Sequence, residues 1–200
     1  MSLPPSRGTQ YEAGLKYQPP GWNAMLTAAV FQITQTNVPK TVAPGDVRQI
    51  GEVTNQGIEL EAVASLGSGW DVQAGFTWLD SEVTKSTELD LHHRPTMVPE
   101  VTAALWTRYT FQAGFAEGLG LGAGVRYVGE RESNGVSVVN GDIVRIVSDS
   151  YTLADLLIGY ELEDWSVALN VRNLFDEAYY GSCLARRDCF PGEERTVNLR

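Results

Sequence analysis

Apolar and polar side chains alternate with a period of two residues along most of the chain. Between residues 56 and 66, apolar side chains such as Ile58 and Leu60 alternate with Glu59 and Glu61. Successive side chains of a β-strand point to opposite faces, so this pattern predicts strands with one apolar and one polar face. It predicts an all-β chain without helices, with nine strands at about residues 11–17, 22–33, 56–66, 70–78, 101–111, 119–127, 156–160, 165–171 and 197–200.

The connections between these strands alternate in length, which predicts an antiparallel up-and-down meander. The short ones lie near residues 18–21, 67–69, 112–118 and 161–164, and the long ones at 35–55, 81–99, 131–150 and 176–194. A soluble sandwich has no reason to place every long loop at one end. A transmembrane β-barrel does so, because its short turns face the periplasm and its long loops face outward.

Aromatic residues form two groups near the strand ends. One group lies beside the short turns: Tyr17, Trp22, Trp70, Tyr109, Phe111, Tyr160 and Trp165. The other lies toward the long loops: Phe31, Phe76, Trp78, Tyr127, Tyr151 and Phe175. A spacing of roughly 20 to 25 Å between them is typical of the aromatic girdles of a lipid-facing band. Aromatics that cap the core of a soluble barrel are the alternative.

Composition narrows the possible partners. The chain has 200 residues, and 25 acidic against 15 basic side chains give a formal net charge of −10. This charge argues against nucleic acid as a partner, because nucleic acid attracts clusters of Lys and Arg. The longest uncharged stretch, between Lys16 and Lys40, is interrupted by Pro19 and Pro20 and cannot form a spanning helix.

Several motifs resemble those of one family. In chain order they are Tyr11–Tyr17 (YEAGLKY), Gly57–Ala62 (GIELEA), Arg94-Pro95 with Val98–Glu100, Gly120–Gly129 (GLGAGVRYVG), Asn173–Tyr180 (NLFDEAYY), Cys183 with Cys189, and Gly192–Val197 (GEERTV). Their order and their positions on the expected strands and loops resemble the TonB-dependent siderophore receptors of the ferrichrome type. The resemblance covers residues 9–200.

The resemblance implies a domain organisation. Such receptors have a transmembrane barrel of 22 strands with an N-terminal plug and a TonB box, and neither plug nor box is found in this sequence. We therefore expect residues 9–200 to be a C-terminal portion of the barrel, and residues 1–8 to be an expression leader or a partial segment. Nine strands of a larger barrel leave two open edges, so we expect an open, twisted sheet.

The resemblance also implies a function and a location. A receptor of this kind lies in the bacterial outer membrane, in contact with lipid, and binds a ferric siderophore, here of the hydroxamate class. It imports this ligand with energy from the TonB complex, without enzymatic chemistry and without a covalently bound cofactor. A passive porin and a soluble β-barrel binding protein are the alternatives.

Four residues have chemistry suited to a bulky chelate with a polar rim, which needs aromatic and hydrogen-bonding groups. Trp106 and Arg126 are expected on the polar face of their strands, and Tyr179 and Tyr180 in the last long connection. These are the candidate ligand-binding residues.

Other residue groups favour structural interpretations. Cys183 and Cys189 are expected to form a disulfide in an oxidising compartment, and a metal site would need further Cys or His nearby. The adjacent His92 and His93 point to opposite sides in an extended loop, so no metal site is expected there. The glycines at 118, 120, 122 and 124 lack the spacing of a dinucleotide-binding loop. They are expected to leave one strand face bare, with room for a packed plug.

Overall fold

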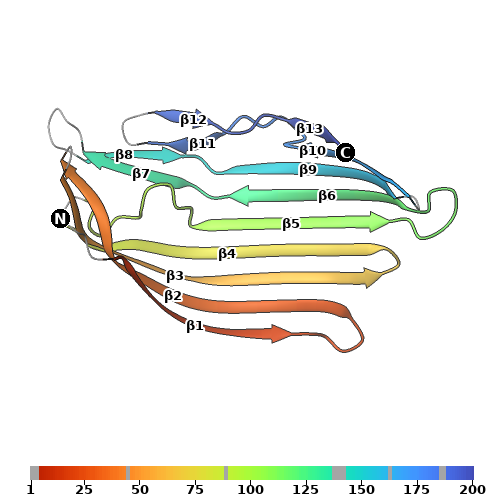
Figure 1. Cartoon of the computed structure of the whole chain (residues 1–200), viewed down its shortest axis with the longest axis horizontal. Coiled ribbons are helices and arrows are strands. Elements are labelled where there is room, and N and C mark those ends of the chain that lie inside the picture. The colour runs from red at the N-terminus through yellow and green to blue at the C-terminus, as the bar shows by residue number, and fades with distance from the viewer. Residues whose placement is uncertain (1–4, 44–45, 88–89, 137–142, 162–163, 185–187) are drawn as a thin grey trace.

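The computed structural model covers the whole chain and describes all residues except 1–4, 44–45, 88–89, 137–142, 162–163 and 185–187. The chain forms one nine-stranded antiparallel sheet and two small two-stranded sheets (Figure 1). In spatial order the large sheet contains β1 (Arg7–Tyr17), β2 (Asn23–Ala43), β3 (Asp46–Gly67), β4 (Trp70–Lys85), β5 (Val101–Thr110), β6 (Leu119–Val128), β9 (Tyr151–Glu161), β10 (Ser166–Arg172) and β13 (Thr196–Leu199). The nine strands and the meander predicted from the sequence are confirmed.

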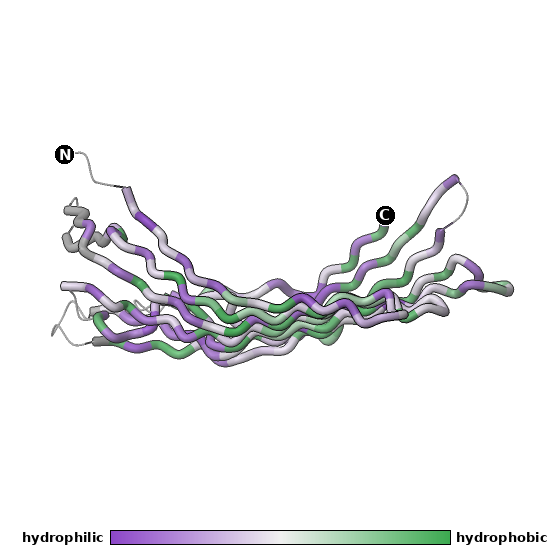
Figure 2. The backbone as a smooth tube through the Cα atoms, turned by 90° about the horizontal axis from the view of Figure 1, so that it is seen from below, coloured by the Kyte–Doolittle hydropathy of each residue, from purple (hydrophilic) through white to green (hydrophobic). Residues whose placement is uncertain are grey.

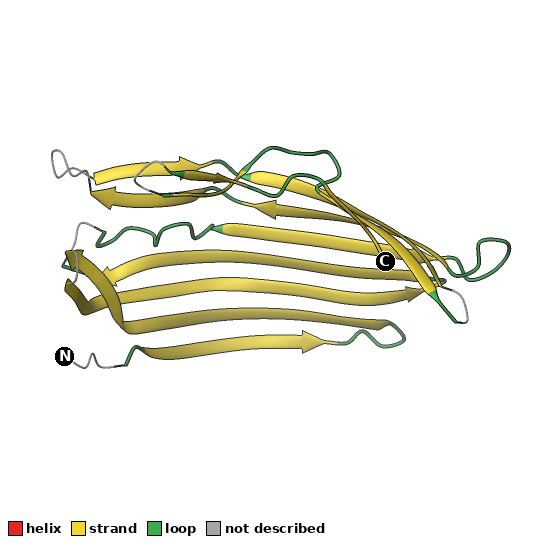
Figure 3. Cartoon of the chain, turned by 45° about the horizontal axis from the view of Figure 1, so that its top comes forward, coloured by secondary structure: helices red, strands yellow, loops and turns green. Residues whose placement is uncertain are grey.

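Two hairpins lie within the long connections, at the same end of the molecule (Figure 1). The first is formed by β7 (Arg131–Val136) and β8 (Ile143–Ser148), and the second by β11 (Tyr180–Cys183) and β12 (Cys189–Pro191). The described residues include no helix (Figure 3), and hence none long and apolar enough to cross a membrane. Within the described part of the chain, β1 pairs only with β2 and β13 only with β10, so the sheet is open at both edges.

The register of the strands places apolar and polar side chains on opposite faces of the sheet. One row across β3 to β6 is Leu60, Phe76, Ala103 and Tyr127, and the next row is Glu61, Gly75, Ala104 and Arg126. Directly paired residues of antiparallel strands share a face. The first row therefore lies on the apolar face and the second on the polar face. Seen edge-on, the sheet is a single curved layer (Figure 2).

The apolar face has a sharp boundary toward the long connections. One row across β2, β3 and β4 is wholly apolar and the next row on the same face is wholly polar: Val30, Ile58 and Trp78 are followed by Gln32, Gln56 and Asp80. Gln56 Nε2 donates a hydrogen bond of 3.0 Å to Asp80 Oδ2. From Trp70 to Trp78 the apolar band is about 20 Å high, which suits the hydrocarbon layer around a tilted strand.

The prediction of a long connection at residues 35–55 is wrong. Strands β2 and β3 continue through most of this range, and β4 continues to Lys85. The loss of the apolar stripe predicts a loop, whereas in the structure it marks the row at which the outer face becomes polar. β-Branched residues keep the chain extended there, and Thr54 Oγ1 lies 3.4 Å from Thr34 Oγ1 and 3.3 Å from Thr84 Oγ1.

Two of the residues assigned to the aromatic girdles lie on the polar face instead. Phe31 pairs with Gly57 and Tyr151 pairs with Val128, both in polar-face rows. Their distance along the strand suits a girdle, but their parity places them on the polar face. At the short-turn end a cluster remains on the apolar face, where ring centroids of Trp70 and Tyr109 are 4.9 Å apart.

Candidate ligand-binding site

The polar face carries a hollow in the middle of the sheet. Its floor is formed by Gly75 of β4 and Ala104 of β5, which lie opposite each other. A Cβ atom at Gly75 would meet nothing within 4 Å, so the space above it is open. The hollow measures about 430 Å³, and Glu61 of β3 and Arg126 of β6 border it on opposite sides. It is a shallow site with acidic and basic groups at its two sides.

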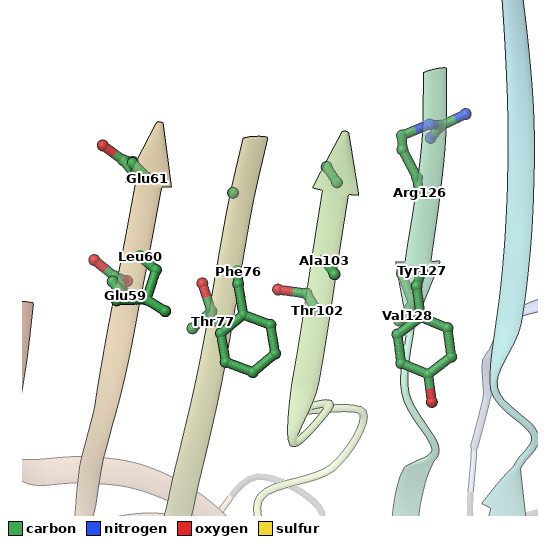
Figure 4. A pocket seen from close by; sticks show the side chains of 12 residues that line it. Glu59, Leu60, Glu61, Phe76, Thr77, Thr102, Ala103, Arg126, Tyr127 and Val128 are labelled. Carbon is green, nitrogen blue, oxygen red and sulfur yellow. The ribbon is translucent and has the colours of Figure 1, made fainter. Parts of the chain in front are cut away.

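A second depression of about 340 Å³ lies at the row of Leu60, Phe76, Ala103 and Tyr127. Phe76 and Tyr127 flank the small Ala103 on neighbouring strands (Figure 4). Its lining also includes Glu61, Gly75, Ala104 and Arg126, so it adjoins the first hollow.

Trp106 forms one wall of the hollow and explains the glycines of β6. A Cβ atom at Gly124 would lie 2.3 Å from Trp106 Cε3, and one at Gly122 would lie 2.8 Å from Trp106 Cζ2. At Gly120 the nearest atom would be Nε of Arg108, at 2.8 Å. The expectation that these glycines leave the face bare is therefore wrong. Side chains of β5 cross to the neighbouring strand and cover them.

Arg126 is held at the edge of the hollow by Asp155 of β9. Its Nε donates to Asp155 Oδ2 at 2.9 Å and its Nη2 donates to Asp155 Oδ1 at 3.1 Å. Two parallel bonds fix the plane of the guanidinium as well as its position. The Arg126 head is thus oriented before any ligand arrives.

Tyr179 lies beyond this ion pair, toward the long connections. Its ring centroid is 4.1 Å from that of Tyr151, and its hydroxyl accepts a 3.2 Å hydrogen bond from the backbone N–H of Glu193. The polar face therefore presents Trp106, then Arg126, then the tyrosine pair along one line.

Tyr180 and the cysteines belong to the hairpin β11–β12. Tyr180 is 57% exposed. Cys183 and Cys189 are joined by a disulfide that closes the hairpin. The structure thus brings Trp106, Arg126 and Tyr179 to the same face and leaves Tyr180 on the hairpin surface. Their roles as ligand contacts stay predictions.

A family model described as the beta-barrel of TonB dependent receptor-like proteins matches residues 2–174. The chain belongs to this family. Membership of this family confirms the all-β barrel architecture and the outer-membrane location that the sequence resemblance implies. The family consists of transport receptors.

Two relatives and one solved structure show the extent of the similarity. The chain is 38% identical over 201 residues to the ferrioxamine B receptor of Salmonella typhimurium, covering 98% of this chain and 28% of that protein. It is 36% identical over 200 residues to the ferrichrome outer membrane transporter and phage receptor of Escherichia coli K12, covering 96% and 26%. The pyoverdine-bound structure of FpvA from P. aeruginosa matches with a TM-score of 0.79 and 26% identity, covering 98% and 27%. This TonB-dependent receptor chain therefore spans little more than a quarter of the length of these relatives.

The sequence reasoning missed Tyr151 as a member of the site. Counting in steps of two from Asp155 would have placed Tyr151 on the polar face. It also missed Arg131, whose contacts join segments about 50 residues apart and leave no local pattern.

The adjacent histidines take no part in this site. His92 Nδ1 lies 2.5 Å from Glu82 Oε1 at the end of β4. Among the residues that the structure describes, no three or more His, Cys, Asp or Glu side chains are placed to hold a metal ion.

Proposed function

We propose that this chain forms part of the wall of a larger TonB-dependent outer-membrane receptor that binds and imports a ferric siderophore of the hydroxamate class. The partition into residues 1–8 and a barrel portion 9–200 belongs to the same proposal. Energy would come from the TonB complex. The barrel itself would bind and pass the ligand without making or breaking bonds, and without a covalently bound cofactor.

The observation that carries the ligand class is the pairing of the arginines around the site. Arg108 lies 3.1 Å from Glu161, Arg126 is bonded twice to Asp155, and Arg172 lies 3.4 Å from Glu193. A ferric catecholate is a strong polyanion and needs unpaired cations for its capture. A ferric hydroxamate carries little or no negative charge, so it suits a site at which Arg108, Arg126 and Arg172 are already paired with carboxylates.

The relatives support the same class. The two receptors at 36% and 38% identity are named for ferrichrome and ferrioxamine B, which are both hydroxamates. The aromatic line of Trp106, Tyr151 and Tyr179 adds apolar contact for the ligand's carbon skeleton, with hydrogen-bonding groups between the rings.

Transport by the complete receptor tests this proposal. It would be expressed in a Gram-negative strain that lacks its own siderophore receptors, and uptake of radioactive iron would be followed. We expect uptake of ferrioxamine B or ferrichrome that disappears in an otherwise identical strain without TonB. Uptake of ferric catecholates alone would contradict the hydroxamate assignment, and uptake that persists without TonB would favour a passive porin.

A further inference from the structure

Several of the best-buried side chains in the described part of the chain lie where its two hairpins meet. Arg131 of β7 is 4% exposed, Ser133 of β7 is fully buried, and Cys183 of β11 is 2% exposed. The large sheet is one layer thick, so its strands bury little. We call the contact of Arg131 and Ser133 with Tyr180, Gly181 and Cys183 the hairpin joint.

Arg131 connects the hairpins through backbone atoms. Its Nη1 donates to the carbonyl oxygen of Gly181 at 2.7 Å, and its Nη2 donates to that of Tyr180 at 2.9 Å. Its guanidinium carbon lies 5.0 Å from the ring centroid of Tyr151. One side chain of β7 therefore binds the backbone of β11 and also covers a ring of the aromatic pair.

The charge of Arg131 has no carboxylate partner within salt-bridge distance in the described part of the chain. A buried cation without a carboxylate depends on every remaining contact, because its desolvation is compensated only by carbonyl oxygens and the aromatic face. Such a residue holds its partners in one geometry.

Ser133 and Met97 extend the joint to a third segment. Ser133 Oγ donates to the carbonyl oxygen of Cys183. The backbone N–H of Cys183 lies 3.5 Å from Met97 Sδ, and the N–H of Met97 donates to the carbonyl oxygen of Glu132 at 2.6 Å. The disulfide-closed hairpin is thus in contact with β7 through Ser133 and with the segment before β5 through Met97.

We propose that Arg131 is a positioning residue that locks hairpins β7–β8 and β11–β12 into one unit and so holds Tyr179 and Tyr180 in their places for ligand capture. The capture half of this inference rests on the proposed siderophore function. The mechanical half stands on the contacts alone. Without the lock, only a fraction of receptors would present the tyrosines correctly, and the apparent affinity would fall by that fraction.

The test uses the complete receptor with spin labels on cysteines that replace Val147 of β8 and Phe190 of β12. Both side chains are exposed, at 45% and 50%. Arg131→Met removes the lock, and Arg131→Lys keeps the charge without the forked pair of bonds. Arg145→Met is the matched control, because Arg145 lies on the same two-stranded sheet and pairs with Glu132 at the surface.

We expect a narrow distance distribution between the labels in the parent receptor and in the Arg145→Met control. Arg131→Met should broaden it, and Arg131→Lys should give an intermediate result. For ferrioxamine B uptake, Arg131→Met should raise KM about tenfold and change the maximal rate less than twofold. A purely structural defect would lower the amount of active receptor, and hence the maximal rate, at constant KM.

Two results would overturn the proposal. An unchanged distance distribution in Arg131→Met refutes the lock, and a broadened distribution with unchanged KM refutes its role in capture. If Arg131→Met is not assembled, Ser133→Ala tests the same joint with a smaller change in both readouts. A parent receptor that takes up no hydroxamate refutes the proposed function, while the distance measurement still decides whether Arg131 locks the hairpins.

Discussion

Asn173 ties both ends of the last long connection to the sheet. It follows β10, is 2% exposed and has a φ of 52°, in the left-handed region. Its Nδ2 donates to the carbonyl oxygens of Glu177 and Glu193, each at 3.0 Å, and its Oδ1 accepts from the N–H of Glu177 at 2.9 Å. Its own N–H donates to Asp155 Oδ1 at 3.0 Å. Replacement by Ala would remove all three side-chain bonds.

The cost of Asn173→Ala can be worked from these contacts. Each lost hydrogen bond is worth about 1 kcal/mol, and the left-handed backbone adds about 1 to 2 kcal/mol for alanine. We expect the local opening free energy of residues 173–195 to fall by about 4 to 5 kcal/mol. Asn173→Gly removes the same bonds without the backbone strain, so it should cost about 1 to 2 kcal/mol less.

Hydrogen exchange of the complete receptor in detergent, followed by mass spectrometry, measures this opening. Amides of residues 173–195 should exchange at least 100-fold faster in Asn173→Ala, with smaller acceleration in Asn173→Gly. Amides of β4 and β5 serve as the internal control and should be unchanged. Equal protection of the last connection in the parent and in both variants would refute the assigned role of the side chain.

Three further predictions concern the faces of the sheet and its orientation. Gly124→Leu should displace the Trp106 indole and lower the free energy of unfolding by about 1 to 3 kcal/mol in urea titrations. Gly75→Leu should be nearly neutral, because the space above Gly75 is open. Ala74→Arg places a charge in the apolar band and should cost about 2 to 4 kcal/mol in the same titration in lipid, while Gln73→Arg, its neighbour on the polar face, should be tolerated. A cysteine at Ser68 should be protected from an impermeant maleimide in intact cells and labelled once the outer membrane is opened, and labelling of intact cells would reverse the assigned orientation.

Strand periodicity predicted the sheet well because lipid and water impose a strict alternation on a single-layer wall. The residues of β4 show why: Val72, Ala74 and Phe76 must all meet hydrocarbon, so their parity is fixed. Beyond the apolar boundary the outer face becomes polar, while Val53 and Val83 pair on the inner face. The alternation therefore no longer indicates a lipid-facing strand, and the sequence pattern did not separate the strands from a loop.

The candidate site was predictable only in part. The strand positions of Trp106 and Arg126 follow from parity, because their neighbours alternate cleanly. Tyr179 was predicted from its chemistry alone, and its contacts, like those of Arg131, join it to the backbone and rings of distant segments. Residues of any type supply backbone partners. A pattern along the chain carries no information about them.

The curved wall has almost no interior of its own, which reverses the usual relation between strands and loops. Lipid on one side and the barrel contents on the other replace the packed core, so a strand position in the wall needs only the right polarity and size. In the hairpin joint, by contrast, each buried side chain has specific contact partners, as side chains in a packed core do. A survey of random substitutions should therefore find the strands permissive within each face and the hairpin joint intolerant, although loops are ordinarily the most variable parts of a protein.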